Sequence, residues 1–268
     1  MTAPASTAQL PDPKALIAEV SMIAEEAGAA ILKIYATDFE ARTKEDSSPV
    51  TDADEAAEAI IAPALKRLTP EIPVVAEEAA AAGDVPDVGD GPFWLVDPLD
   101  GTKEFLNRNG EFTVNIALIA DHKPVLGVVL APAIETLYRG IAGQGAERRV
   151  GAEDPAPIAV REPPADGLTV IASRRHGDPE EIGQFLKGRA IAEMTNAGSS
   201  LKFCKVAAGE ADLYPRFGRT MEWDTAAGQA VLEAAGGAVT ETDGTPFRYA
   251  KNAIFENPHF VAWGGLRP

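Results

Sequence analysis

The sequence has almost no cysteine: Cys204 is the single one among 268 residues. An internal disulfide is therefore excluded, and the chain suits a reducing compartment such as the cytoplasm. Cys204 lies at helical spacing among apolar residues such as Phe203 and Val206, so we interpret it as a packing residue.

Long apolar runs and basic residues are also scarce. No stretch approaches the length of a membrane span, and the opening MTAPASTAQLPDP lacks the basic and apolar regions of a signal peptide. We therefore expect residues 1–12 to be a frayed tail. Lys and Arg total 24 against 41 Asp and Glu, which gives a formal net charge of −17. This balance argues against a nucleic-acid partner, because phosphate backbones are held by basic surfaces.

Apolar residues make up 46% of the chain, enough for a sizeable core, and they follow short helical and strand patterns. Helical spacing predicts a helix over residues 13–36. The stretch SSPVTDADEAAEAIIAPALKRL predicts a loop and a second helix, capped by Thr51 or Asp52 and kinked at Pro63.

Strand patterns follow these helices. FTVNIALIA and PVLGVVLA, joined by the turn DHKP, predict an antiparallel hairpin. The composition turns to Pro, Gly and acid near residue 155, and strand and helix patterns alternate after it. We therefore expect a mixed α/β layered protein with an N-terminal α+β subdomain over 13–155 and a C-terminal α/β subdomain over 156–268.

In the stretch WLVDPLDGTKEF, an apolar strand pattern runs directly into two aspartates. Asp97 and Asp100 stand three residues apart across a proline-containing turn, so both carboxylates and the Leu99 carbonyl could face one point. Two carboxylates and a carbonyl form the hard oxygen site that suits Mg²⁺. An ordinary Asp-Pro-x-Asp-Gly turn that ends a strand explains the same residues, and this motif alone leaves both interpretations open.

Three further junctions between predicted elements are acidic. They contain Glu77 and Glu78 in VVAEE, Asp52 and Asp54 in PVTDADEAAE, and Asp224 in EWDTAAG. A solvated strand end, acidic residues in a first helical turn and a helix cap would explain them one by one. Four such junctions in one chain favour a shared acidic site.

In chain order, the stretches PVTDAD, VVAEE, WLVDPLDGT and EWDTAAG resemble the inositol monophosphatase-like metal-dependent phosphatases over nearly the whole chain. Within that superfamily, DGTKEF, AGSSLKFCKVAAGEADLYPR and EWDTAAGQAVLEAAGG are most similar to the bacterial 3′(2′),5′-bisphosphate nucleotidases of the CysQ type, whereas inositol-specific relatives usually carry DGTTNF. The resemblance implies an α/β (α+β) layered sandwich with alternating α-β-α-β-α layers, the fold of inositol monophosphatase and fructose-1,6-bisphosphatase. The implied reaction is the hydrolysis of adenosine 3′,5′-bisphosphate to AMP and phosphate.

The resemblance also implies roles for the acidic residues. The ligands of two to three Mg²⁺ ions would be Glu77, Asp97, the Leu99 carbonyl, Asp100 and Asp224. The ions would bind the scissile phosphate and activate a water, which Thr102 would orient and Asp54 would deprotonate. Because bound divalent cations invert the local field, an acidic protein can then bind a polyanion. Inhibition by Li⁺ is implied as well.

The second half of the chain would hold the rest of the substrate. Small residues in NAGSSLKFC could expose backbone N–H groups to an anion, and the cluster Ser173-Arg174-Arg175-His176 could bind a second phosphate. A serine helix cap and a solvated loop are the respective alternatives, and relatives usually carry a Ser-x-Ser-His-like stretch at the second place. The predicted substrate contacts are Glu77, Leu99, Asp100, Gly101, Thr102, Ser173, His176, Gly198, Ser199, Ser200, Lys202, Arg216 and Asp224.

Two other functions stay open from the sequence. The same chemistry could act on a sugar or polyol monophosphate such as inositol phosphate, and a non-catalytic nucleotide or metal sensor could share the fold. DGTKEF and the basic cluster favour the nucleotidase, and the complete pair of Asp54 and Thr102 disfavours the sensor. We expect a small phosphorylated nucleotide as partner, no nucleic acid, no integral membrane segment and a cytoplasmic location. The relatives add a homodimer and peripheral contact with the inner membrane as options.

Overall fold

The computed structural model describes residues 10–38, 42–43, 49–173, 179–250, 252 and 254–266. The helices are α1 (Pro13–Tyr35), α2 (Asp52–Leu68), α3 (Glu77–Ala81), α4 (Thr102–Leu106), the 3₁₀ helix η1 (Pro132–Ile134), α5 (Pro179–Leu186), α6 (Leu201–Ala207) and α7 (Glu222–Ala234). The strands are β1 (Arg42–Thr43), β2 (Pro49–Val50), β3 (Val74–Ala76), β4 (Phe93–Asp100), β5 (Thr113–Ala120), β6 (Lys123–Ala131), β7 (Thr136–Ile141), β8 (Gly145–Val150), β9 (Ala156–Ile158), β10 (Leu168–Ala172), β11 (Ile191–Asn196), β12 (Leu213–Arg216), β13 (Ala238–Glu241) and β14 (Phe260–Trp263).

Two large sheets form the frame. The first has seven strands in the order β3-β4-β5-β6-β7-β8-β9, and all neighbours are antiparallel except β3 and β4. The second has five strands in the order β11-β10-β12-β14-β13, with β10 parallel to both of its neighbours. The β5–β6 pair confirms the predicted hairpin.

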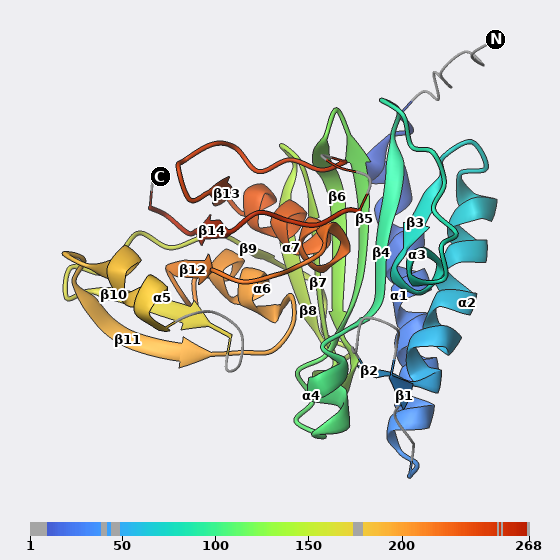
Figure 1. The fold of residues 1–268 in the computed structure, drawn as a ribbon, viewed down its shortest axis with the longest axis horizontal. Helices are drawn as coiled ribbons and strands as arrows, with labels where there is room; N and C mark the ends of the chain where they lie inside the picture. The colour runs from blue at the N-terminus through green and yellow to red at the C-terminus, as the bar shows by residue number, and fades with distance from the viewer. Residues whose placement is uncertain are drawn as a thin grey trace.

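Helices and sheets alternate in layers, as Figure 1 shows. Helices α1 and α2 cover one face of the seven-stranded sheet, and α6 and α7 lie between the two sheets. Helix α5 packs against the other face of the five-stranded sheet through Ile182, Phe185 and Leu186. The predicted α-β-α-β-α sandwich is therefore confirmed.

The first four residues of β4, Phe93 to Val96, are all apolar because both faces of the strand are covered. Trp94 and Val96 belong to the core beneath α1 and α2, whereas Phe93 and Leu95 belong to the core between the sheets. Successive side chains of a strand point to opposite faces, so a strand covered on both faces needs no polar alternation. This arrangement makes β4 a rigid support for the acidic residues at its end.

Strands β8 and β9 were not predicted from the sequence. GAERRV carries three charged residues, and all three form ion pairs: Arg148 with Glu210 at 2.8 Å, Glu147 with Arg139 at 2.7 Å, and Arg149 with Glu25 of α1. Because β9 belongs to the seven-stranded sheet, the change from one sheet to the other falls between β9 and β10. The subdomain division at residue 155 stays a prediction, and residues 1–9 of the predicted tail lie outside the described part of the chain.

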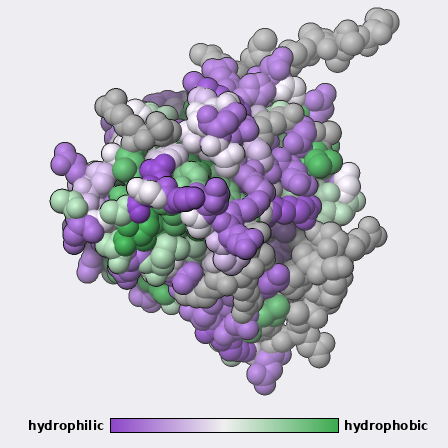
Figure 2. Space-filling model, turned by 60° about the vertical axis from the view of Figure 1, so that its left-hand side comes forward, coloured by the Kyte–Doolittle hydropathy of each residue, from purple (hydrophilic) through white to green (hydrophobic). Residues whose placement is uncertain are grey.

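The outer surface is mostly hydrophilic on the face shown in Figure 2. Hydrophobic residues gather toward the left of this face. In the described ranges, no helix combines the length and the apolar character that crossing a membrane requires. The homodimer, the cytoplasmic location and the contact with the inner membrane stay predictions.

Candidate active site

One cavity of about 260 Å³ lies where the end of β4, the starts of α3, α4 and α7, and the loop before α6 meet. Most of the predicted site residues line it: Glu77, Asp97, Leu99, Asp100, Gly101, Thr102, Ser173, Gly198, Ser199, Lys202, Arg216 and Asp224. The structure thus brings together residues that are up to 147 positions apart (Glu77 to Asp224, 224 − 77).

An irregularity in β4 turns both aspartates of DPLDG into the cavity. Asp97 pairs with Asn115 of β5, and Asp100 pairs with Thr113, so β4 spans three steps where β5 spans two. In a regular strand, residues three apart point to opposite faces, and one extra residue reverses that alternation. The Leu99 N–H donates to Asp97 Oδ1 at 3.1 Å and holds the bulge.

Gly101 follows directly and starts α4. Its φ of +91° is a left-handed conformation that favours glycine, and a Cβ there would lie 3.3 Å from the Cβ of Ser199. This glycine lets the backbone turn from β4 into α4 within one residue, so that Thr102 follows Asp100 into the cavity.

Glu77 reaches the same edge because β3 and β4 are parallel neighbours. It is the first residue of α3, whose N-terminus is capped from α2: the N–H groups of Glu78 and Ala79 each donate to the Glu58 carboxylate at 2.8 Å. Glu77 lines the cavity and Glu78 does not. Of the two neighbouring glutamates, only Glu77 is therefore placed to act in the cavity.

Asp54 lies behind the cavity wall and is buried. Its Oδ2 accepts hydrogen bonds from the N–H and the hydroxyl of Thr51, both at 2.8 Å, and its Oδ1 accepts one from the Thr102 hydroxyl at 3.3 Å. Thr51 is thus the N-cap of α2, one of the two predicted residues, and Asp54 completes the capping box. The cap fixes the carboxylate that faces Thr102.

Asp224 occupies the third position of α7. Its Oδ2 accepts the Met221 N–H at 2.8 Å, so the helix-cap interpretation holds. The residue also lines the cavity. Capping and cavity lining are therefore compatible for this aspartate.

Burial and neighbouring charges shift the pKa values of the carboxylates in the cavity. Burial raises the pKa of Asp224 to about 8, and the charges of Asp100 and Glu77 add to the shift. Burial also raises the pKa of Asp97 well above its ordinary value, followed by the charges of Glu77, Asp100 and Asp224. Burial raises the pKa of Asp100 too, but the charge of Lys202 opposes it. Like charges held together in a buried cavity need a cation or a proton to compensate them.

We tested these residues against the cation that the sequence resemblance implies. In the part of the chain that the structure describes, no three Asp, Glu, His or Cys side chains converge as a ready-made site for one ion. Mg²⁺ does not require such a cage, because it is usually held by one or two carboxylates and completes its shell with waters and substrate phosphate. Four carboxylates around one cavity therefore fit divalent cations.

The opposite side of the cavity is cationic. Lys202 is buried, and its ammonium donates to the carbonyls of Ser199 at 2.5 Å and Ala197 at 3.3 Å. It also lies 5.3 Å from the centre of the Tyr214 ring. Burial lowers its pKa to about 8, against the charge of Asp100, which raises it. Arg216 is buried as well and donates to the Arg219 carbonyl at 3.1 Å.

The loop before α6 differs from the prediction. The Gly198 N–H donates to Glu111 Oε2 at 2.8 Å, and the Ser200 N–H donates to Asp100 Oδ2 at 2.6 Å. Neither N–H is therefore available to a phosphate in this structure. The Ser200 hydroxyl donates to the Asp224 carbonyl at 2.7 Å and does not cap α6, and Ser200 lies outside the cavity lining.

Gly198 has a steric role in this loop. A Cβ at this position would lie 2.5 Å from Glu104 Cγ and 2.7 Å from the Glu111 carbonyl oxygen, closer than side chains tolerate. The small residue that suggested an anion site is therefore required by close packing against α4 and the loop that follows it.

The predicted basic cluster is described only in part. Ser173 follows β10 and lines the cavity. Arg174, Arg175 and His176 lie outside the described residues, so their predicted contacts with a second phosphate stay predictions.

Several cavity residues were not predicted: Lys103, Glu104, Phe203, Tyr214, Arg219, Thr220 and Thr225. Lys103 and Glu104 belong to the DGTKEF stretch, so this motif could have pointed to them as cavity residues. Tyr214 and Arg219 flank the predicted Arg216 in YPRFGRT. The stretch that carries Arg216 and runs into EWDTAAG was the available signal for them.

Known proteins resemble this chain over most of its length. The model of the inositol monophosphatase family matches residues 12–263. The 3′(2′),5′-bisphosphate nucleotidase CysQ of Salmonella typhimurium is 45% identical over 247 residues, which cover 91% of this chain and 98% of the relative. CysQ of Escherichia coli K12 is 44% identical over the same shares of the two chains.

Solved structures of related proteins are similar to this chain as well. The crystal structure of CysQ from Bacteroides thetaiotaomicron has a TM-score of 0.77 and 38% sequence identity, covering 93% of this chain and 97% of that one. An inositol monophosphatase from Anabaena has a TM-score of 0.71 and 26% identity, covering 94% and 91%. The family match spans most of the chain and both groups of relatives share its fold, so this protein belongs to the inositol monophosphatase family.

Proposed function

We propose that the chain is a Mg²⁺-dependent 3′(2′),5′-bisphosphate nucleotidase that hydrolyses adenosine 3′,5′-bisphosphate to AMP and phosphate. The names of its CysQ relatives, at 44–45% identity over 91% of the chain, support the substrate. The family supports a metal-dependent phosphatase. We further propose that two to three Mg²⁺ ions bind the cavity.

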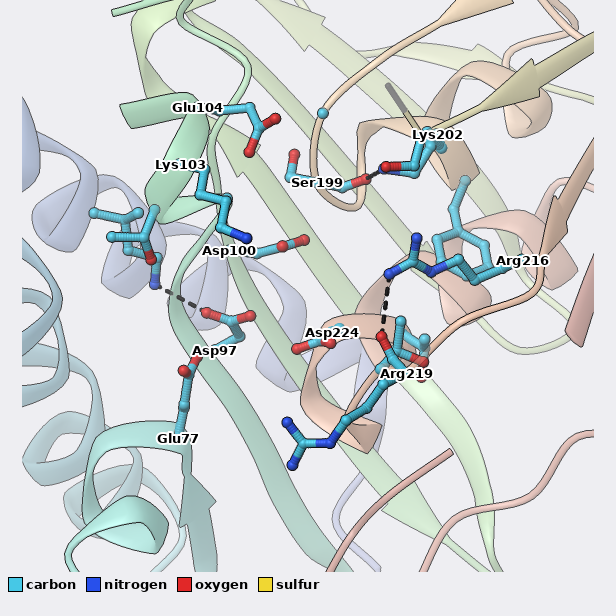
Figure 3. Close-up of a pocket in the computed structure, with 18 of the residues that line it drawn as sticks. Glu77, Asp97, Asp100, Lys103, Glu104, Ser199, Lys202, Arg216, Arg219 and Asp224 are labelled. Atoms are coloured by element: carbon cyan, nitrogen blue, oxygen red, sulfur yellow. Dashed lines mark hydrogen bonds between the residues drawn. The ribbon is translucent and has the colours of Figure 1, made fainter. Parts of the chain in front are cut away.

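The observation that carries the proposal is the division of the cavity into two walls. The acidic wall consists of Glu77, Asp97, Asp100 and Asp224, and the cationic wall consists of Lys202, Arg216 and Arg219. In Figure 3 the carboxylates gather at the left and centre, where Lys103 also points toward Asp100, whereas Lys202 and Arg216 lie at the right. A substrate with two phosphates suits such a cavity, since one phosphate can meet cations held by the acidic wall and the other can meet the basic side chains.

Glu77, Asp97, the Leu99 carbonyl, Asp100 and Asp224 would hold the ions. Bound there, such ions would supply binding of phosphate oxygens, a water that is nucleophilic near neutral pH, and stabilisation of charge on the leaving oxygen and among the carboxylates. None of these five groups donates or accepts a proton in the proposed reaction.

Thr102 and Asp54 would handle the proton. The Thr102 hydroxyl donates to Asp54 Oδ1, so the lone pairs of its oxygen are turned away from Asp54 and can accept a hydrogen bond from a water in the cavity. The proton of that water passes to Thr102 Oγ1 as the threonine proton passes to Asp54 Oδ1. The two hydrogen bonds from Thr51 to Oδ2 keep the carboxylate oriented during this transfer.

Phosphate release from adenosine 3′,5′-bisphosphate and from inositol 1-phosphate, each with Mg²⁺ and with chelator, tests the proposal. We expect fast release from the nucleotide that chelator abolishes. Release mainly from inositol 1-phosphate would keep the metal site and overturn the nucleotide substrate. Absence of release from both would favour the non-catalytic sensor.

A further inference from the structure

Asn115 of β5 lies behind the acidic wall and was not among the predicted site residues. Its side chain is 1% exposed, and both amide hydrogens are used: Nδ2 donates to Asp100 Oδ2 at 3.2 Å and to Ser200 Oγ at 3.0 Å. The opposite amide orientation would turn its oxygen toward the Asp100 carboxylate, which is repulsive, so the hydrogen-bond partners fix the assignment.

Ser200 continues this connection to α7. Its N–H donates to Asp100 Oδ2 at 2.6 Å, and its hydroxyl donates to the carbonyl of Asp224 at 2.7 Å. The residue is 1% exposed. Asn115 and Ser200 therefore link the end of β4 in the first sheet to the starts of α6 and α7 beside the second sheet.

Asp100 lies within reach of the charge of Lys202, and two neutral donors bind one of its oxygens. Asn115 Nδ2 and the Ser200 N–H both bind Oδ2. Neutral donors orient a carboxylate without neutralising its charge, whereas a bound cation would compete with a metal ion for it. This arrangement keeps the charge of Asp100 for a ligand on the cavity side.

We propose that Asn115 and Ser200 are positioning residues for divalent cations: they fix Asp100 and the Asp224 backbone relative to each other and thereby set the affinity of the acidic wall for Mg²⁺. This inference rests on the proposed metal site and changes the role of Ser200 from a substrate contact to a support of the ligands. Residues that orient ligands in this way typically contribute about 10-fold to 100-fold to metal affinity.

Mg²⁺ binding to the chelator-stripped full-length protein, measured by calorimetry, tests the inference without reference to activity. We expect Asn115→Ala to weaken Mg²⁺ binding about 10-fold or more, and Ser200→Ala to weaken it less, because the Ser200 backbone N–H remains. At saturating Mg²⁺, the KM for adenosine 3′,5′-bisphosphate should change less than about twofold, since neither side chain lines the cavity.

Thr113→Val is the matched control. Thr113 lies two residues from Asn115 on β5, pairs with Asp100 and is fully buried, but its hydroxyl has no hydrogen-bond partner among the residues that the structure describes. This variant should bind Mg²⁺ as the wild type does. If Asn115→Ala fails to fold, Ser200→Ala carries the test, because it removes only one hydroxyl group from a buried residue.

The outcomes separate the two proposals. Wild-type protein that does not bind Mg²⁺ overturns the proposed metal site itself. Wild-type binding with unchanged affinity in both variants overturns the positioning role alone. Unchanged Mg²⁺ affinity with a raised substrate KM in Ser200→Ala would return Ser200 to the substrate contacts.

Discussion

The acidic wall and the cationic wall of the cavity are built in different ways. Asp97 and Asp100 stand at a strand end, and Glu77 and Asp224 stand in the first turns of helices, where backbone N–H groups and local caps hold acidic residues in place. Lys202, by contrast, is held by carbonyls of the loop that precedes α6 and by the Tyr214 ring of β12. The residues of the acidic wall therefore have local signals in the sequence, and those of the cationic wall depend on packing between elements.

The two walls also differ in how they use charge. Burial and like charges raise the pKa of Asp97 and Asp224, and burial lowers the pKa of Lys202 to about 8. Arg216 lies within electrostatic reach of both walls, because its charge lowers the pKa of Asp224 and of Lys202. Burying charged groups costs free energy in each wall. Together the two walls form a cavity that can bind cations on one side and an anion on the other.

The largest expected effect comes from removing one charge of the acidic wall. Asp97→Asn keeps the shape and the acceptor for the Leu99 N–H, but it removes a ligand charge. We expect phosphate release to fall about 1,000-fold, or roughly 4 kcal/mol of transition-state stabilisation. In chelator, the variant should unfold at a higher temperature than the wild type, because a buried repulsion is gone.

Unchanged phosphate release in Asp97→Asn would contradict the acidic wall as a metal site and favour the sensor. Asp52→Asn is a suitable control, because it makes the same substitution at an exposed residue outside the cavity lining. It should leave phosphate release close to the wild-type rate.

The next effect separates proton transfer from metal binding. Thr102→Val removes the hydroxyl that donates to Asp54, and we expect kcat to fall about 100-fold or more. Mg²⁺ affinity should stay as in the wild type. Thr102→Ser keeps the hydroxyl and should retain most of the activity, and equal losses in both variants would argue against this role.

A smaller effect is expected from replacing a residue of the cationic wall. Arg219 is 60% exposed in its side chain and pairs with Glu256 at 3.3 Å. We expect Arg219→Gln to raise the KM for adenosine 3′,5′-bisphosphate about two- to fivefold, the size typical of an exposed charge pair. The KM for adenosine 3′-monophosphate should not change, since that substrate lacks the second phosphate.

Glu256→Gln provides the matched control for Arg219. It removes the charge that pairs with Arg219 and leaves the arginine in the cavity lining. The KM for the bisphosphate should stay equal or fall. A rise in the KM for both nucleotides in Arg219→Gln would point to general distortion of the cavity.

The smallest effect concerns pH and the removal of metal. An aspartate whose folded pKa is raised contributes stability fully only below its ordinary value of 3.8, and this contribution is lost as pH rises through the folded pKa. For Asp224 the loss extends to about pH 8. Chelated protein should therefore lose Tm between pH 4 and 8, on the order of a few °C more than protein with Mg²⁺.

Differential scanning calorimetry across this pH range, with and without Mg²⁺, measures the difference. Asp224→Asn should reduce the difference in Tm between chelated and Mg²⁺-bound protein, because the substitution removes one carboxyl group whose pKa is raised. Parallel Tm curves with and without the metal would show that Mg²⁺ does not relieve the repulsion within the acidic wall.

The sequence determined most of the elements and the residues of the acidic wall because their signals are local. Apolar runs predicted strands such as β4 and β5, Thr51 or Asp52 was predicted to cap α2, and DPLDG was predicted to place two aspartates at the end of β4. Each of these features depends on residues within a few positions of one another, where caps, turns and hydrophobic periodicity act.

The tertiary structure alone decided which groups those elements bring together. Asn115 reads as one polar residue in an apolar strand, and only the pairing of β5 with β4 places it at Asp100. Gly198 and Ser200 suggested an anion site, yet their N–H groups bind Glu111 and Asp100 instead. Contacts between residues about 85 positions apart in the chain, such as Asn115 with Ser200, arise from packing the two sheets around α6 and α7, which no local pattern encodes.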